Sequence, residues 1–408
     1  MFGSEIQQSK VLKWALGALI FQYFINFYWW ATSTVGTLES VRQFTYVCPR
    51  FFQQCQELYF LDTLPYGYSQ TTFYLFLLGL LAYIVYLMQQ GRWQLATIVT
   101  VIPFVWHTLN VFILTGVRDG NYQYYVFIFG FTLLFLQHKE FFLKLFVVFF
   151  YFLSTVAKTH PGWIAGTYFS TLELGLPLVP DALIPVATNV VIMMEMVGAW
   201  FLLSRNLLYQ RLALFFFIFF HLYSSILVGW HYPSIVLPMV LLLFGPLYRY
   251  TVPPIDRAAI TGWLVAALLL CMQFIPVMIP GDEKLTLEGN KYGLYMFEAN
   301  HQCQSEVVVT YHNDSTLILN NDSNNAPHRC DPYDYWFDIT RQLCEGDSLV
   351  KTVQWRFDHS INGEPFLRIV DETNICEREY KPFSRNEWIK SHEDNPEVIG
   401  PAPKNVYY

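Results

Sequence analysis

The sequence predicts a polytopic α-helical membrane protein of about nine transmembrane helices, followed by a β-rich exoplasmic domain. Of its 408 residues, 54% are hydrophobic and 18% are aromatic, while only 14% are charged. Apolar runs long enough to cross a bilayer recur up to residue 280, and the remaining chain is polar and rich in turn residues. We therefore expect a transmembrane domain at 1–280 and a disulfide-containing exoplasmic domain at 281–408.

The expected spans are nine apolar runs. They cover residues 14–33, 71–88, 95–116, 122–136, 141–157, 183–203, 212–228, 235–247 and 258–279. A helix of about 20 residues crosses the hydrocarbon core of a bilayer, and the fourth and eighth runs are shorter than this length. No small-residue cleavage site follows the first run, which is therefore expected to remain as an anchor.

Basic residues predict the orientation of the spans. Nine lysines and arginines fall in one set of short connections and only four in the other. The positive-inside rule then places the N-terminus in the cytoplasm, and an odd number of spans places the C-terminal domain outside. A bacterial inner membrane with a periplasmic domain is favoured; the alternative is an endoplasmic reticulum membrane with a lumenal domain.

The second domain is acidic. From Gly281 onward the chain contains 22 acidic and 12 basic residues, a balance of about −10. This balance argues against a nucleic-acid partner. Strands are expected near residues 306–311, 351–357 and 365–370, and a short helix near 335–343, from their β-branched and aromatic content and the turn residues between them.

Cysteine placement agrees with this topology. Six of the seven cysteines fall in segments expected outside, namely Cys48, Cys55, Cys303, Cys330, Cys344 and Cys376. An even number in an oxidising compartment predicts disulfides, although six cysteines permit 15 pairings. The alternative is a metal site, but no tight Cys-x-x-Cys or paired histidines accompany them, so no metal is expected. Cys271, inside a span, is expected to be a small buried apolar residue.

Lys158 is the leading functional candidate, because it lies at the outer end of the fifth span. An ionisable residue within a membrane is expensive to desolvate, and desolvation favours the neutral amine, which can act as a base. The alternative is a lysine whose charge extends to the lipid headgroups. Glu195, within the sixth span, has three interpretations: a paired structural residue, a group that orients His221, or a wall of a ligand pocket.

Several segments, in the same order along the chain, resemble the vitamin K-dependent γ-carboxylase family and its bacterial relatives, the HTTM-domain proteins. The matching pieces are residues 121–135, 151–163, Glu195, the pair Phe220 and His221, and then 293–297, 307–311, 338–344, 355–357 and 382–385. Residues 151–163 resemble the segment that carries the catalytic lysine of that family. The chain is thus similar to a short bacterial-type homologue.

The resemblance implies a carbon–carbon lyase that couples oxygenation of a reduced naphthoquinone to its epoxide with carboxylation of glutamate in an exoplasmic peptide. Its cofactor would be reduced vitamin K, and its co-substrates dioxygen and carbon dioxide. Lys158 would take the proton of the hydroquinone. The supporting or pocket residues would be Asn121, Tyr122, Trp163, Glu195 and His221. The expected partners are membrane lipid, the quinone and a glutamate-containing peptide or protein.

Two departures from the family pattern bear on the implied activity, the first on acid–base chemistry at the quinone and the second on binding of the substrate. Tyr122 stands where the family has histidine, and Asn300 and Gln302 stand where basic residues help to hold the substrate carboxylate; His301 would fill that role after a shift of one position. Neutral amides bind a carboxylate less strongly than charged groups do. The alternative functions are therefore a quinone-binding redox or assembly protein without carboxylase activity and, less favoured because no inverted repeat is visible, a transporter.

Overall fold

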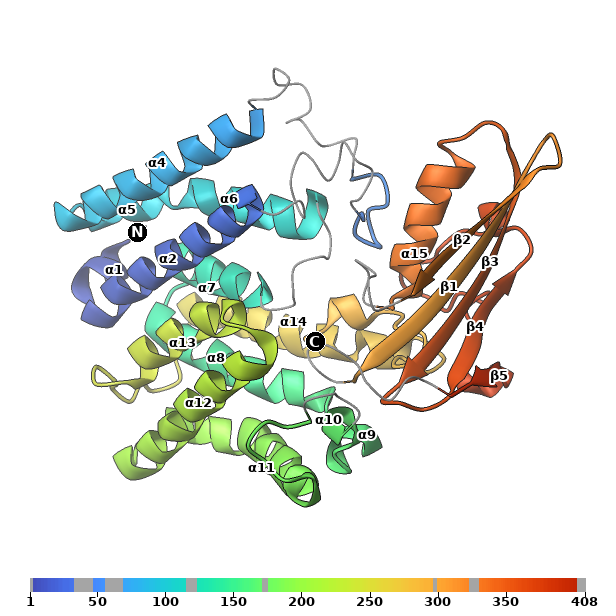
Figure 1. Cartoon of the computed structure of the whole chain (residues 1–408). Helices are drawn as coiled ribbons and strands as arrows, with labels where there is room; N and C mark the ends of the chain where they lie inside the picture. Colours follow the sequence, from blue (N-terminus) through green and yellow to red (C-terminus); the bar gives the residue numbers. More distant parts are fainter. Residues whose placement is uncertain are drawn as a thin grey trace.

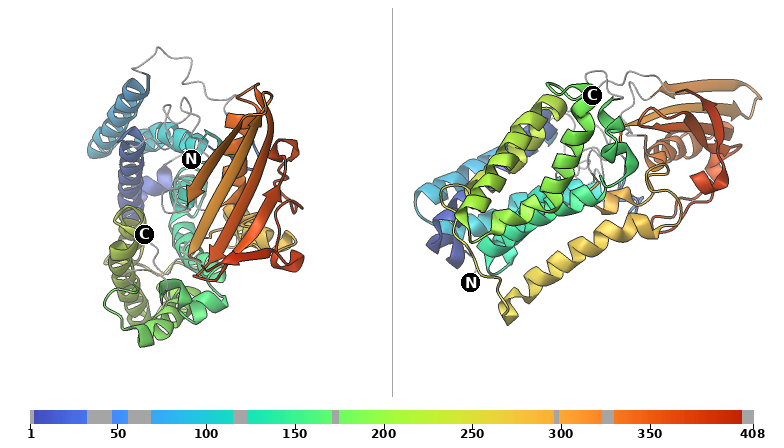
Figure 2. Two further views of the ribbon diagram at one scale, coloured as in Figure 1. Left: turned by 45° about the vertical axis from the view of Figure 1, so that its right-hand side comes forward. Right: turned by 90° about the horizontal axis from the view of Figure 1, so that it is seen from below.

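The molecule consists of a helical bundle joined to a five-stranded sheet (Figure 1). The computed structural model describes residues 3–32, 47–55, 69–114, 123–170, 175–295, 299–322 and 330–401. The helix α14 (Ile260–Met278) leads from the bundle to the sheet domain, as the right-hand view in Figure 2 shows.

Each expected apolar run coincides with helix in the part of the chain that is described. The segments are α2 (Lys10–Thr32), α4 (Ser69–Gln89), α5 (Trp93–Val99) with α6 (Val101–Leu109) and η3 (Asn110–Leu114), α7 (Gln123–Phe135), α8 (Lys139–Val156), α11 (Ile184–Met196) with η5 (Gly198–Leu203), α12 (Leu207–Val228), α13 (His231–Phe244) and α14 (Ile260–Met278). Six of the described helical segments are long and apolar enough to cross a membrane, whereas α7 and α13 are shorter. The protein is therefore membrane-associated.

Helix α8 lies at the centre of the bundle, and most of its side chains are buried. It makes contacts with α7, α11, α13 and α14. The approach to α14 is close, because a Cβ atom at Gly262 would come within 2.3 Å of the Phe142 ring. Polar side chains on a helix so deeply enclosed need partners from neighbouring helices, since an unpaired polar group is costly to bury.

The second domain is an antiparallel sheet with strand order β2-β1-β3-β4-β5. Its strands are β1 (His301–Tyr311), β2 (Thr316–Asp322), β3 (Val350–Ile361), β4 (Phe366–Glu372) and β5 (Glu397–Gly400), and the helix α15 (Pro332–Ile339) accompanies them. Side chains alternate across a strand, and Val307 and Val309 of β1 accordingly point into the core. The β-rich domain and its short helix lie where the sequence predicts them.

Six of the seven cysteines form three disulfides, as predicted. The pairs are Cys48–Cys55, Cys303–Cys330 and Cys344–Cys376. The expectation for Cys271 was wrong, because this side chain is exposed on α14. An exposed apolar thiol is acceptable there because that helix is apolar around most of its surface, as expected of a helix that borders lipid.

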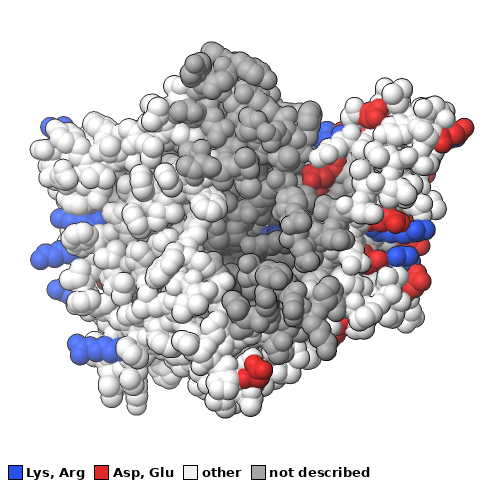
Figure 3. All heavy atoms as spheres, viewed as in Figure 1, with Lys and Arg blue, Asp and Glu red and all other residues white. Residues whose placement is uncertain are grey.

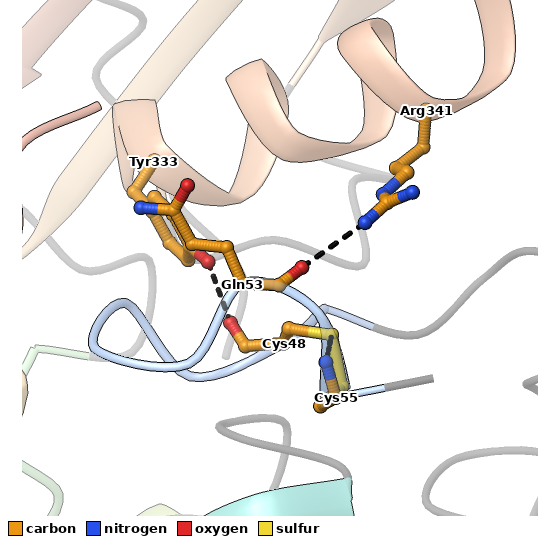
Figure 4. The surroundings of a disulfide bond; sticks show 5 residues. All are labelled: Cys48, Gln53, Cys55, Tyr333 and Arg341. Atoms are coloured by element: carbon orange, nitrogen blue, oxygen red, sulfur yellow. Dashed lines mark hydrogen bonds between the residues drawn. A yellow bond between two sulfur atoms is a disulfide. The ribbon is translucent and has the colours of Figure 1, made fainter. Parts of the chain in front are cut away.

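The segment 47–55, between α2 and α4, belongs to the core of the sheet domain (Figure 4). The Tyr333 hydroxyl of α15 donates a hydrogen bond of 2.8 Å to the carbonyl of Cys48, and the Arg341 guanidinium donates one of 3.1 Å to the carbonyl of Gln53. Two parts of the sequence nearly 300 residues apart therefore share one hydrophobic core.

Arg50 fastens this segment to the domain. Its guanidinium forms an ion pair with Asp331 and donates a hydrogen bond of 2.9 Å to the Leu287 carbonyl. The rings of Tyr333 and Tyr380 lie 5.5 and 5.8 Å from its Cζ atom. The charge is thus buried beside an opposite charge, a carbonyl oxygen and two aromatic rings, although Nε of Arg50 has no hydrogen-bond partner in the described residues.

Charged side chains are unevenly distributed on the visible face. The end of the bundle that lies away from the sheet shows lysines and arginines, whereas the sheet domain shows aspartates and glutamates with lysines and arginines among them (Figure 3). A membrane whose cytoplasmic face met the basic end would satisfy the positive-inside rule. The orientation itself stays a prediction.

Candidate functional site

Three polar side chains lie along one side of α8 at the end nearest the sheet domain. Tyr151, Thr155 and Lys158 are spaced by four and three residues, a spacing that places side chains on the same helical face. Lys158 lies two residues after the end of α8, and its backbone N–H donates to the Thr155 carbonyl at 2.9 Å. Lys284, at the start of the second domain, donates to the Ala157 carbonyl at 3.3 Å, so this helix end contacts that domain.

Lys158 forms a buried ion pair with Glu195 of α11. Its Nζ atom lies 2.8 Å from Oε2 of Glu195, and the two side chains are only 6% and 2% exposed. Thr155 donates a second hydrogen bond, of 2.6 Å, to the same carboxylate oxygen. The amine is therefore held inside the protein, which is not the arrangement of a lysine that extends to the headgroups.

One aromatic ring covers the amine, and a second ring stacks on the first. The Trp163 ring of α9 (Pro161–Ile164) has its centroid 5.4 Å from Nζ of Lys158. Trp163 in turn stacks on Tyr168 of α10 (Thr167–Ser170), with 5.4 Å between centroids and 19° between planes. A ring face attracts a cation and also offers a flat apolar surface to another ring.

His221 of α12 is oriented by Tyr151. The Tyr151 hydroxyl lies 2.6 Å from Nε2 of His221, and the histidine is fully buried. Glu195, one proposed orienter of His221, instead contacts Lys158 and Thr155. Within the described residues, Nδ1 of His221 has no hydrogen-bond partner, so one polar atom remains to meet a ligand.

The three substrate-binding candidates lie at the start of β1, at the edge of the second domain. The backbone N–H of Asn300 donates to the side-chain Oδ1 of Asn362 at 2.9 Å. The backbone N–H of Asn362 donates to the backbone carbonyl of Asn300 at 2.8 Å. Gln302 is buried. The side chain of Asn362 also lies close to the loop after Lys158. A Cβ atom added at Gly162 would come within 2.2 Å of its side-chain nitrogen, Nδ2. This corner of the sheet therefore touches the segment that presents Trp163.

His301 is paired with another histidine of the sheet. Its Nδ1 atom lies 3.0 Å from Nε2 of His359, and Nδ1 of His359 donates to the Leu285 carbonyl at 2.7 Å. The second contact fixes the tautomer, so Nε2 of His359 accepts the proton of His301. Burial, together with the nearby His301, lowers the pKa of His359 to about 3, and His359 is thus neutral at physiological pH.

The remaining pocket candidates, Asn121 and Tyr122, lie outside the described residues. The next residue, Gln123 of α7, contacts Nε2 of His107 at 2.8 Å and accepts a hydrogen bond of 3.0 Å from Asn26. No group of three or more metal-binding side chains occurs in the described ranges.

Sequence reasoning missed Tyr151 and Thr155 as site residues. Both carry hydroxyl groups that contact residues already under consideration, His221 and Glu195. Tyr151 precedes Lys158 by seven residues and Thr155 precedes it by three. This spacing was the signal that could have identified them, since it places all three side chains on one helical face.

Comparisons with protein-family models, with curated proteins and with solved structures found no match.

Proposed function

We propose that this protein is a membrane enzyme of the vitamin K-dependent γ-carboxylase type, in which Lys158 accepts a proton from a reduced naphthoquinone. The carrying observation is the buried pair of Lys158 and Glu195, held at the helix end that meets the second domain. In the proposed topology, the chain crosses the membrane nine times with its N-terminus in the cytoplasm. The pair then lies at the outer membrane boundary, accessible to a lipid-soluble quinone and to an exoplasmic peptide.

The pair acts as one acid–base unit. Lys158 and Glu195 lie 2.8 Å apart, and in the proposed mechanism the proton between them moves to Glu195, which leaves Lys158 neutral and able to accept the proton of the hydroquinone. The net charge of the pair is zero in both forms. Accepting one more proton makes the unit positive, which stabilises an anion beside it, and this effect is strong where water is excluded. Thr155 keeps the carboxylate in place through its 2.6 Å hydrogen bond.

The surrounding side chains fit a flat, partly polar ligand. Trp163 and Tyr168 offer a stacked aromatic face, and Nδ1 of His221 offers a polar atom without another partner in the described residues. Reduced vitamin K, when bound, would supply the oxygen-derived base that removes the γ-proton of glutamate before carbon dioxide adds. The enclosed site protects such chemistry from water.

Quinone oxidation without carboxylation is the second candidate. Asn300 and Gln302 are uncharged and buried, and the backbone of Asn300 is bound to Asn362. A carboxylate substrate would meet no cation from these two positions. This observation favours a quinone-binding redox or assembly protein that has the proton-accepting site alone.

Two assays on the purified protein test the proposal: oxidation of reduced vitamin K, and incorporation of labelled carbon dioxide into a glutamyl peptide. Lys158→Ala should abolish both, and Lys158→Arg should also fail because a guanidinium stays protonated. Lys144→Ala is the matched control. Lys144 is also a buried lysine of α8, and its Nζ atom lies 2.8 Å from Glu140, but at the opposite end of the helix.

The Lys144 variant should lose stability yet keep its activity per folded molecule. Full activity in Lys158→Arg would overturn the role of Lys158 as a base. Quinone oxidation without carbon dioxide incorporation in the wild-type protein would favour the second candidate.

A further inference from the structure

A groove of about 330 Å³ opens on the bundle at the end that lies away from the sheet. It is formed by the first half of α8, by η5, by the chain after α13 and by α14. Its lining is almost entirely apolar and includes Phe141, Leu145, Phe149, Trp200, Tyr250 and Trp263. Lys158 follows Phe149 by nine residues, roughly 13 Å along a helix, so the groove is separate from the candidate active site.

The groove is built into the packing of the bundle. The hydroxyl of Tyr248 donates a hydrogen bond of 2.9 Å to the Ser204 carbonyl, which joins the end of α13 to the chain after η5. The indole of Trp263 donates one of 2.8 Å to the Pro254 carbonyl. These contacts hold two aromatic walls in place without a ligand, so binding would not have to order them.

Its floor is buried and its rim is open. Leu145 is 5% exposed, whereas Trp200, Tyr250 and Trp263 are 40%, 37% and 38% exposed. A long apolar chain can therefore enter from the side of the bundle and lie against the floor. Tryptophan and tyrosine at such a rim are typical of the depth where lipid headgroups begin.

Two arginines lie at the same rim. The Arg205 guanidinium lies over the Tyr250 ring, with its Cζ atom 4.6 Å from the centroid, and Arg249 is the residue before that tyrosine. Both are exposed, and neither forms an ion pair within the described part of the chain. Lys144 donates to the Arg249 carbonyl at 2.7 Å and so fixes the backbone there, its own charge being balanced by Glu140.

We propose that this groove binds one anionic phospholipid, with an acyl chain between the aromatic walls and the phosphate beside Arg205 and Arg249. The apolar groove would accommodate the acyl chain. The two arginines, which have no ion-pair partner among the described residues, would favour a negatively charged headgroup. Nothing in this proposal depends on the chemistry at Lys158.

The test reconstitutes the full chain in vesicles of equal parts phosphatidylglycerol and phosphatidylcholine. The protein is then extracted in mild detergent, and the lipid that remains bound is measured by mass spectrometry. The wild-type protein should retain phosphatidylglycerol in excess. Arg205→Gln and Arg249→Gln should each lower that excess about fivefold, the effect of one charge near an anionic headgroup. Arg211→Gln, an exposed arginine of α12 outside the groove, is the matched control and should change nothing.

A second variant, Leu145→Trp, fills the groove from its floor and keeps both arginines. It should lose the bound lipid altogether; Leu203→Trp fills the groove from another wall if the first variant does not fold. Unchanged retention of phosphatidylglycerol in a folded, groove-filled variant would overturn the proposal. So would an undiminished excess of phosphatidylglycerol in a variant that carries both Arg205→Gln and Arg249→Gln. Recovery of a quinone in place of phospholipid would also overturn it.

Discussion

Replacing Arg50 by alanine removes the group that binds the segment 47–55 to the sheet domain. Arg50 and its partner Asp331 have side chains that are 1% and 2% exposed. In the variant, the carboxylate of Asp331 stays buried without its cation, and the Leu287 carbonyl loses the hydrogen bond that Arg50 donates. The loss should therefore exceed that of an ordinary surface substitution.

The magnitude follows from burial. Removing one partner of a buried ion pair costs about 3–5 kcal/mol, and the lost hydrogen bond adds about 1 kcal/mol. Burial already raises the pKa of Asp331, an effect that Arg50 opposes, so protonation of Asp331 will limit the loss in the variant. We expect a decrease of about 4 kcal/mol in the free energy of unfolding, or a thermal midpoint lower by about 10 °C.

Arg356→Ala is the matched control in the same domain. The Arg356 side chain is 40% exposed and its guanidinium lies 3.0 Å from Glu306, so its removal should cost less than about 1 kcal/mol. Unfolding of the purified, oxidised chain in detergent can be followed by tryptophan fluorescence. Adding Asp331→Asn to the Arg50 variant should restore part of the stability, because no unpaired charge then remains. Equal shifts for the two arginine variants would refute the reasoning.

The remaining predictions concern the disulfides, pH, the acid–base pair and the topology. Replacing Cys303 and Cys330, which are 27 residues apart, by serine should destabilise the domain by about 3–4 kcal/mol, measured by thermal unfolding; an unchanged midpoint would contradict this. Because the pKa of His359 falls to about 3 on folding, the unfolded chain binds its proton first as pH decreases. Stability should be complete above about pH 6.5 and fall by about 3 kcal/mol by pH 4, a loss that His359→Gln should not show. Glu195→Gln should abolish hydroquinone oxidation, since an amide cannot share the proton of its lysine partner; retained activity would leave the pair a structural role. A C-terminal reporter should be active only outside the cytoplasm, and cytoplasmic activity would exclude the expected orientation.

Local features of the sequence were sufficient for the elements of the fold. Each expected apolar run proved helical in the described chain, because burying a backbone in an apolar medium requires internal hydrogen bonds. The strand-like runs at 306–311 and 351–357 became parts of β1 and β3 for a similar reason, since β-branched and aromatic residues fit a half-buried pleated surface.

The sequence alone did not predict which distant residues contact each other. Lys158 and Glu195 were both candidates, but 37 residues separate them, and no local periodicity shows that their helices present these side chains to each other. The same holds for Arg50 and Asp331, which are 281 residues apart, and for the choice among cysteine pairings. Such contacts depend on how helices and loops pack, which a single sequence does not specify by pattern alone.

The contact between Arg50 and Asp331 also sets an order of assembly. Asp331 follows Arg50 by 281 residues. Because synthesis proceeds at about 5–20 residues per second, Asp331 is added roughly 15–55 s after Arg50. During that interval Cys48 and Cys55 can form their disulfide without the rest of the domain. The apolar residues of this loop, however, have no sheet domain to pack against yet. The sheet domain must then fold around a segment that left the ribosome first. A chain cut before α15 would therefore leave both parts without their shared core, and the segment 47–55 would be exposed to proteases and chaperones.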